Sequence, residues 1–114
     1  MIDVTLWTAD GHTAGFRISG HAGYEDSGKD IVCAAVTSAM QLTANGITEI
    51  LFYQPELRVE ENAVTLQTNG KCQDPRVFAL LDSLRLQLEV LDRTVGINLA
   101  TQFRVPCLSL HIIY

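Results

Sequence analysis

Two side chains capable of nucleophilic chemistry, His21 and Cys33, lie twelve positions apart in the N-terminal third of the chain. A thiol becomes a nucleophile when it loses its proton, and an imidazole is well suited to accept that proton near neutral pH. The segment between them is long enough for its ends to meet, although spacing alone does not show that they do. We therefore take Cys33 as the candidate nucleophile and His21 as the candidate general base.

The residues around Cys33 predict a helix that begins just before it. Apolar residues recur at three- and four-residue steps from Ile31 to Leu51, and Asp30 is a suitable N-cap. Cys33 would then lie in the first turn, where unpaired N–H groups and the helix dipole favour a thiolate. Asp30 could instead orient His21, but a carboxylate so close to Cys33 opposes thiolate formation. Capping is therefore the main role expected of Asp30, with orientation of His21 as the alternative.

A polar segment with three glycines runs from Gly20 to Asp30 and shows neither helical nor strand periodicity. It predicts a loop that leads from the base to the nucleophile. We expect Gly20 to give this loop its freedom, and Gly23 and Gly28 to let it close over a substrate. The same glycines could also serve turn geometry only.

The remaining pattern predicts one α/β (α+β) domain over residues 1–114, with the order β-β-α-β-β-α-β. A sheet packs against two helices, and the first helix, rich in Ala and poor in charge, is expected to be buried at the centre of the fold. The predicted elements are strands over 2–7 and 14–18 joined by Asp10-Gly11, strands over 57–59 and 64–66 joined by Glu61-Asn62, a helix from Asp74-Pro75 to about Gly96, and a strand over 97–105. The apolar tail from Cys107 to Tyr114 should pack on the domain or on a partner subunit.

Composition excludes several classes of protein. A net charge of -5 argues against binding nucleic acid through general electrostatics, and no apolar stretch of membrane-spanning length is present. The N-terminus lacks the pattern of an export signal, so we expect a cytoplasmic protein with no membrane partner. Cys33, Cys72 and Cys107 are odd in number and widely spaced, which favours free thiols. No spacing typical of a metal site occurs, and we expect neither metal nor cofactor.

These patterns alone leave the function open. A cysteine in an apolar helix is usually a buried and unreactive side chain, and a single histidine at a strand end is usually structural. Thr37, one turn after Cys33, could simply bond back to the carbonyl of that residue. Besides an enzyme, a non-catalytic binding module in which Cys33 is merely packed and a redox-sensing thiol protein are alternatives. The redox alternative is weakened because neither Cys72 nor Cys107 lies close to Cys33 in the chain.

The string Gly-His-Ala-Gly-Tyr-Glu-Asp-Ser-Gly-Lys-Asp-Ile-Val-Cys-Ala-Ala-Val-Thr at residues 20–37 resembles the signature of the bacterial ribosomal-processing cysteine proteases, the Prp family. That signature is Gly-His-Ala, a variable loop, and then Gly-x-Asp-Ile-Val-Cys-Ala. The predicted element order is similar to that family over roughly residues 1–105. The resemblance places the catalytic residues at His21 and Cys33 and the motif's glycine and aspartate at Gly20 and Asp30. Thr37 stands where the family commonly has Ser, so the hydroxyl is kept.

The resemblance also implies an activity. Members of this family remove a short N-terminal extension from the large-subunit ribosomal protein numbered twenty-seven, and they are usually homodimers. We therefore expect a cytoplasmic thiol protease of ribosome biogenesis whose partners are a ribosomal protein precursor and a second copy of the chain. The alternative is a non-catalytic ribosome-assembly binding module. A substrate with aromatic residues before the cleaved bond is also implied, which calls for an apolar pocket near the site.

Overall fold

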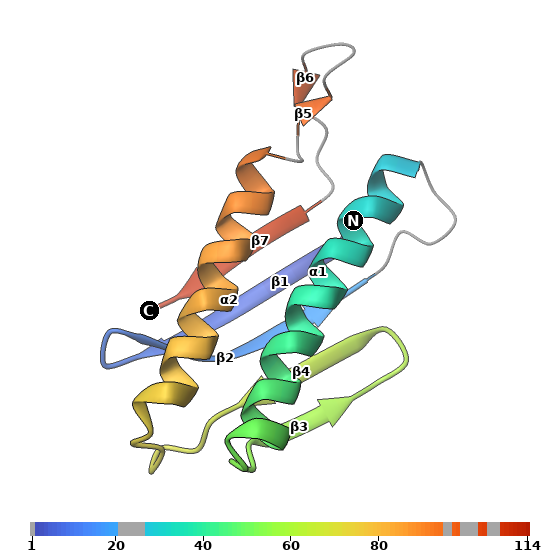
Figure 1. Ribbon diagram of the computed structural model, residues 1–114. Coiled ribbons are helices and arrows are strands. Elements are labelled where there is room, and N and C mark those ends of the chain that lie inside the picture. Colours follow the sequence, from blue (N-terminus) through green and yellow to red (C-terminus); the bar gives the residue numbers. More distant parts are fainter. Residues whose placement is uncertain (1, 21–26, 95–96, 99–102, 105–107) are drawn as a thin grey trace.

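The computed structural model describes residues 2–20, 27–94, 97–98, 103–104 and 108–114. For 27–32, 94, 97–98, 103–104 and 108–109 it describes the backbone only. Figure 1 shows two layers, a sheet and a pair of helices that cover one of its faces. The α/β (α+β) class predicted from the sequence is confirmed.

The N-terminal hairpin forms where the sequence predicts it. Strand β1 (Ile2–Ala9) pairs antiparallel with β2 (His12–Ser19), and every second residue of β1 from Ile2 to Leu6 is buried. The turn residues Asp10 and Gly11 both have positive φ, at 53° and 81°. Two successive residues with positive φ are typical of the type I′ turn, whose twist matches that of the strands it joins.

A second hairpin and the chain's last segment complete the sheet. Strand β3 (Glu56–Val59) pairs with β4 (Ala63–Gln67), and β4 pairs with β2, both antiparallel. Strand β7 (Leu108–Ile113) lies parallel to β1, so the order is β3-β4-β2-β1-β7. Leu110 and Ile112 pack against the core, which confirms that the apolar tail packs on the domain.

The strand predicted over 97–105 is wrong. Its described parts, β5 (Ile97–Asn98) and β6 (Phe103–Arg104), pair with each other in a separate two-stranded sheet. The tail takes the place beside β1 instead. Apolar and polar residues alternate in both segments, but the tail is the segment that pairs with β1, over the six residues from Leu108 to Ile113.

The first helix starts earlier than predicted. Helix α1 spans Ser27–Asn45 and continues as a π-helical turn, η1 (Gly46–Ile50), in which the Leu51 N–H bonds the Gly46 carbonyl at 3.0 Å. Asp30 therefore lies inside the helix and is not its N-cap. The extra turn at the start changes the surroundings expected for Cys33.

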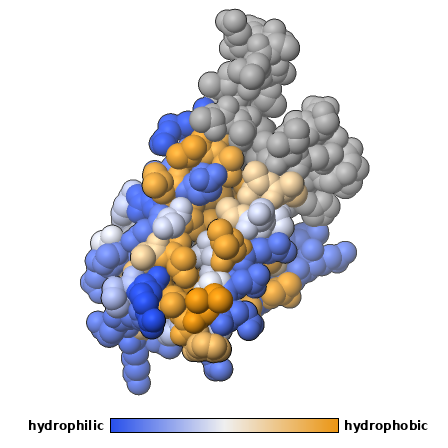
Figure 2. Space-filling view, viewed as in Figure 1, coloured by the Kyte–Doolittle hydropathy of each residue, from blue (hydrophilic) through white to orange (hydrophobic). Residues whose placement is uncertain are grey.

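Helix α1 covers the sheet but is not enclosed. Val36, Met40 and Thr43 are buried towards the core, whereas Leu42 on another side is 74% exposed. The helix expected to be largely buried at the centre of the fold thus contributes to the core along one face and is exposed along another. Figure 2 shows apolar side chains gathered on this helix-covered side of the molecule.

Helix α2 (Pro75–Thr94) begins as predicted from Asp74-Pro75. The Arg76 N–H donates to Asp74 Oδ1 at 2.9 Å, and the Val77 N–H bonds the Asp74 carbonyl at 3.1 Å. The face predicted to be apolar is buried at Val77, Leu81, Leu84, Leu88 and Leu91. Among the described residues, no helix is long and apolar enough to cross a membrane.

An ionic contact joins α2 to the start of β2. Asp82 Oδ1 accepts the Thr13 N–H at 2.8 Å, and Asp82 Oδ2 lies 3.1 Å from His12 Nδ1. The His12 ring also stacks on Phe78, with centroids 5.1 Å apart. Burial raises the pKa of the Asp82 carboxyl, but the bonds from Thr13 and His12 outweigh it and leave that pKa below its usual value.

We predict that this contact makes stability depend on pH in the acid range. Because the pKa of Asp82 is lower in the folded protein than the ordinary 3.8, its contribution is present above about pH 4 and is lost as pH falls through the folded value. Asp82→Asn should therefore be less stable than wild type at pH 7. Urea unfolding at several pH values should show the difference shrinking below pH 4, and a constant difference would contradict the assignment.

Gly15 in the middle of β2 allows β4 to approach closely. A Cβ built at this position would lie 2.6 Å from the Leu66 carbonyl oxygen, whereas one at Gly70 would meet nothing within 4 Å. We predict that Gly15→Ala lowers the free energy of unfolding by about 1–3 kcal/mol, because strand backbone has to shift. Gly70→Ala is the matched control and should be near neutral. Equal effects of the two substitutions in urea unfolding would contradict this account.

Candidate active site

Cys33 lies in α1 as a free, half-buried thiol that packs against the edge of the hydrophobic core. Thr37 follows one turn later on the same flank of the helix and is also half-buried. The opposite flank, with Ala35, Ala39 and Leu42, lines a cavity of about 410 Å³ shared with α2. Successive helix residues are rotated by about 100°, so Cys33 lies on the flank directed away from α2.

The earlier helix start removes one expected source of thiolate stabilisation. With the first helical residue at Ser27, Cys33 lies beyond the first turn, where N–H groups are paired within the helix. The helix dipole also acts mainly on the first turn. The expectation that Cys33 is activated by a helix N-terminus is therefore wrong for this conformation. A neighbouring base is the remaining route to a reactive thiol.

Gly20 has a left-handed backbone conformation at the point where the chain leaves β2, directly before the proposed base. It follows β2 directly, has φ +82°, and donates its N–H to the Asn62 carbonyl at 2.9 Å. A residue with a Cβ rarely adopts this φ. The special backbone expected at Gly20 is therefore present, and it joins the end of the central strand to the turn between β3 and β4.

Other predicted site residues are placed only in part. His21 and Gly23 lie outside the described residues, so their distance from Cys33 stays a prediction. Gly28, expected in the loop, is inside the first turn of α1, and Asp30 follows it there. The structure places Cys33 and Thr37 one turn apart in α1 and places Gly20 directly after β2.

A second set of chemically capable residues lies at the other end of β2. His12 and Cys72 line one cavity of about 390 Å³ together with Asn69 and Phe78. Cys72 is only 9% exposed, which leaves little room for attack on a substrate. His12 and Gly20 lie at opposite ends of an eight-residue strand, roughly 25 Å apart at the usual rise per residue. His12 therefore lies at the opposite end of β2 from the segment that leads to Cys33.

We predict that Gly20→Ala destabilises the protein by about 1–2 kcal/mol, the usual cost of left-handed backbone for a residue with a Cβ. The reason is the φ of +82° at this position, which the bond to Asn62 maintains. Urea unfolding against Gly70→Ala, where an added Cβ meets nothing within 4 Å, provides the comparison. A Gly20→Ala protein as stable as the Gly70→Ala control would show that this backbone geometry is not required.

Several solved structures have the same fold as this chain. Protein SMU.848 of Streptococcus mutans is 22% identical, with a TM-score of 0.80 over 99% of this chain and 94% of that one. An essential ribosomal processing protease Prp from S. aureus, in complex with a substrate peptide, is 18% identical, with a TM-score of 0.76 over 98% and 99% of the two chains. The same S. aureus protease with a covalently linked product peptide is 16% identical, with the same TM-score and the same coverage of both chains. No curated protein matches the chain.

A match to a protein family shows the family to which this chain belongs. The model of the family described as cysteine protease Prp matches residues 1–99, which include the whole motif from Gly20 to Thr37. This confirms the resemblance seen in the sequence and gives no support to a non-catalytic module. The chain belongs to the cysteine protease Prp family and is a cysteine protease.

Proposed function

We propose that this protease acts in the cytoplasm and removes the short N-terminal extension of the large-subunit ribosomal protein numbered twenty-seven. The observation that carries the proposal is the family match over the motif that contains His21 and Cys33. The similar S. aureus protein is a ribosomal processing protease that binds a substrate peptide and also holds a product peptide covalently. A covalently held product is what a cysteine nucleophile leaves before hydrolysis.

In this proposal His21 takes the proton of the Cys33 thiol, and the thiolate attacks the carbonyl carbon of the peptide bond. The resulting tetrahedral oxyanion collapses, the C–N bond breaks, and the imidazolium gives its proton to the leaving amine. Water, deprotonated by the same imidazole, then attacks the thioester. Hydrolysis releases the carboxylate product and restores the thiol.

The helix geometry constrains where the oxyanion is stabilised. In α1 the N–H of Cys33 is paired with the carbonyl four residues earlier, so it is not free to donate. Oxyanion donors are worth roughly 3–4 kcal/mol each in other enzymes, so an active site needs them. We assign them to backbone N–H groups near the start of α1 that have no partner within the helix. Gly20 is the residue at which the chain leaves the sheet before this helix.

The half-buried state of Cys33 fits a site that opens only when a substrate arrives. Thr37, one turn further on, supplies a hydroxyl on the same flank of the helix. A peptide bound there would meet the flank of α1 that faces away from α2. Such limited access would spare other cellular proteins from cleavage.

We predict that Cys33→Ala reduces cleavage of the ribosomal protein precursor to less than about one hundredth of wild type, because nucleophile and base act as a unit. Product mass identifies the cleaved bond. The fold should persist, because the replaced side chain is half-buried and α1 already carries neighbouring alanines. Cys72→Ala is the matched control and should keep the activity. Substantial cleavage by Cys33→Ala would exclude Cys33 as the nucleophile.

The choice of substrate is tested separately from the chemistry. Wild-type protein that alkylates rapidly at Cys33 but leaves the precursor intact would contradict the ribosomal substrate while keeping the protease. If Cys33 alkylates no faster than the buried Cys72, the mechanism itself loses its support.

A further inference from the structure

The five-stranded sheet has a second face, opposite the one that the helices cover. Figure 1 shows α1 and α2 on one and the same side of the sheet. Leu6 and Phe16 belong to the core and point towards the helices. Because successive side chains of a strand point to opposite faces, Trp7 and Arg17 project from the other side. We call this second surface the open face.

One row of side chains crosses the open face from edge to edge. The register of the five strands aligns one residue of each strand in this order: Arg58, Thr65, Arg17, Thr5 and His111. Neighbouring strands lie about 4.8 Å apart, so the row is roughly 19 Å long. It contains two guanidinium groups, an imidazole and two hydroxyls, and it contains no carboxylate. We call it the cationic row.

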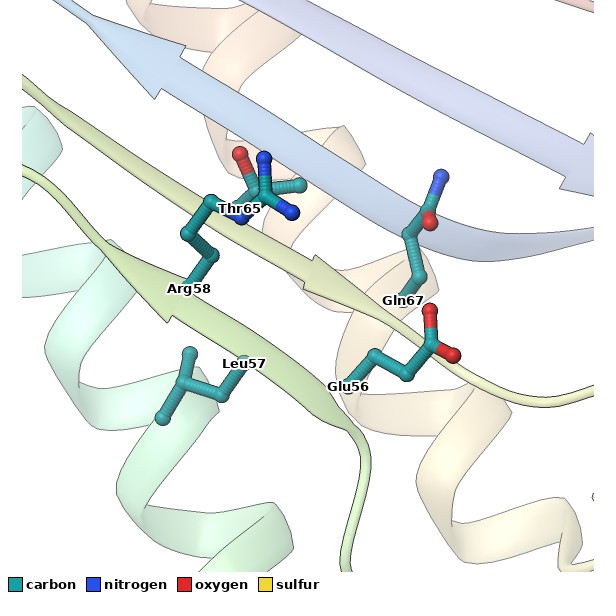
Figure 3. A pocket seen from close by; sticks show the side chains of 5 residues that line it. All are labelled: Glu56, Leu57, Arg58, Thr65 and Gln67. Atoms are coloured by element: carbon teal, nitrogen blue, oxygen red, sulfur yellow. The ribbon is translucent and has the colours of Figure 1, made fainter.

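The two arginines of the cationic row have no partner of opposite charge. Arg17 and Arg58 are exposed, and within the described part of the chain neither forms an ion pair. On α2, by contrast, Arg76 and Arg85 are each paired with a carboxylate. Figure 3 shows Arg58 beside Thr65, with which it is in register. Arg17 flanks Thr65 from the other strand, so both guanidinium groups are available to one anionic ligand over β4.

The single tryptophan of the chain lies next to this row. Trp7 is the outward-facing residue that follows Thr5 on β1, and it is half-buried. Its partners across the strands are Ile113 on one side and Gly15 on the other. Gly15 has no side chain, so the indole has no cross-strand neighbour there. An indole beside cationic and hydroxyl groups on an uncovered sheet is typical of a surface on which nucleic-acid bases stack.

Two carboxylates on the open face lie outside the cationic row. Glu56 is in register with Gln67, and Asp3 is in register with Ser19. Each carboxylate is two residues away from the row along its own strand, about 7 Å. A hollow of about 480 Å³ between β3 and β4 has Arg58 and Thr65 in its lining, and Glu56 lines it too. The carboxylates repel an anion from the flanking rows, so an anionic chain fits best along the cationic row, across the strands.

We propose that the open face binds a short single-stranded polynucleotide. Its phosphates follow the cationic row, and one of its bases stacks on Trp7. Guanidinium groups bind phosphate oxygens through paired hydrogen bonds, and threonine hydroxyls add further ones. Stacking contributes affinity that does not depend on charge. The net charge of -5 argues against binding through general electrostatics, so binding rests on these few contacts and is weak and sensitive to salt.

Tryptophan fluorescence tests the position of the ligand, because Trp7 is the single tryptophan of the chain. At low salt, an oligouridylate of six nucleotides should quench this fluorescence to saturation. An oligothymidylate of the same length distinguishes RNA from DNA, and saturable quenching by either supports the proposal. A peptide of six glutamates carries negative charge without bases and should not quench. Equal quenching by this peptide would identify an acidic peptide as the ligand and overturn the proposal, as would the absence of saturable quenching by both oligonucleotides.

Substitutions separate the phosphate contacts from the stacking contact, with affinity read from the fluorescence anisotropy of a labelled oligonucleotide. Arg17→Gln and Arg58→Gln should each weaken binding and reduce the slope of log K against log salt concentration by about 0.7, the effect of one lost phosphate contact on a single strand. Trp7→Ala should weaken binding at least about fivefold and leave that slope unchanged. Lys71→Gln removes the same charge from the segment between β4 and α2 and is the matched control.

Circular dichroism shows whether each variant is folded, and the two arginine variants keep the test valid if Trp7→Ala is not. Arginine variants that bind like wild type, or a Lys71→Gln protein weakened as much as they are, would overturn the proposal. So would a wild-type affinity that does not change with salt. None of these outcomes depends on peptide cleavage, so the open face is tested independently of the proposed substrate.

Discussion

The hydrogen bond from the Gly20 N–H to the Asn62 carbonyl determines where the chain leaves the sheet on its way to the nucleophile. β2 is the middle strand, paired on both sides, so its path is set as far as Ser19. Gly20 then turns with φ +82°, and the next residue is the proposed base. The point at which the chain leaves the sheet is therefore set by the backbone of Gly20 and by the turn between β3 and β4.

Because Cys33 lies beyond the first turn of α1, we expect its thiol to be activated by a neighbouring base. A thiol at a helix N-terminus can be activated by the helix itself, but one beyond the first turn gains little from the dipole. In the proposed mechanism the base is His21, which follows the end of β2, and the oxyanion donors lie outside the paired turns of α1. The proposed nucleophile thus comes from a helix, and the proposed base comes directly after the residue that ends the middle strand.

Local signals predicted most of the fold. Asp10-Gly11 and Asp74-Pro75 identified a turn and a helix start because each acts through its own backbone. The start of α1 was mistaken because Asp30 suits an N-cap, yet the helix continues back to Ser27. Alternation also could not tell residues 97–105 from 108–113, since the partner of β7 is β1, a hundred residues away. The motif predicted Cys33, His21 and Gly20 as site residues, but no local rule predicts the distance between His21 and the thiol.

The two edges of the sheet differ in a way that bears on the site. At the β7 edge, Tyr114 follows the strand and is held by Arg85, whose Nη2 donates to the tyrosine Oη at 3.0 Å while the guanidinium lies 5.5 Å from the ring centre. At the β3 edge, no comparable clamp is present among the described residues. The hairpin that carries this free edge also carries Asn62, the anchor of Gly20. The outer hairpin of the sheet therefore also holds the residue at which the chain leaves the middle strand towards the proposed base.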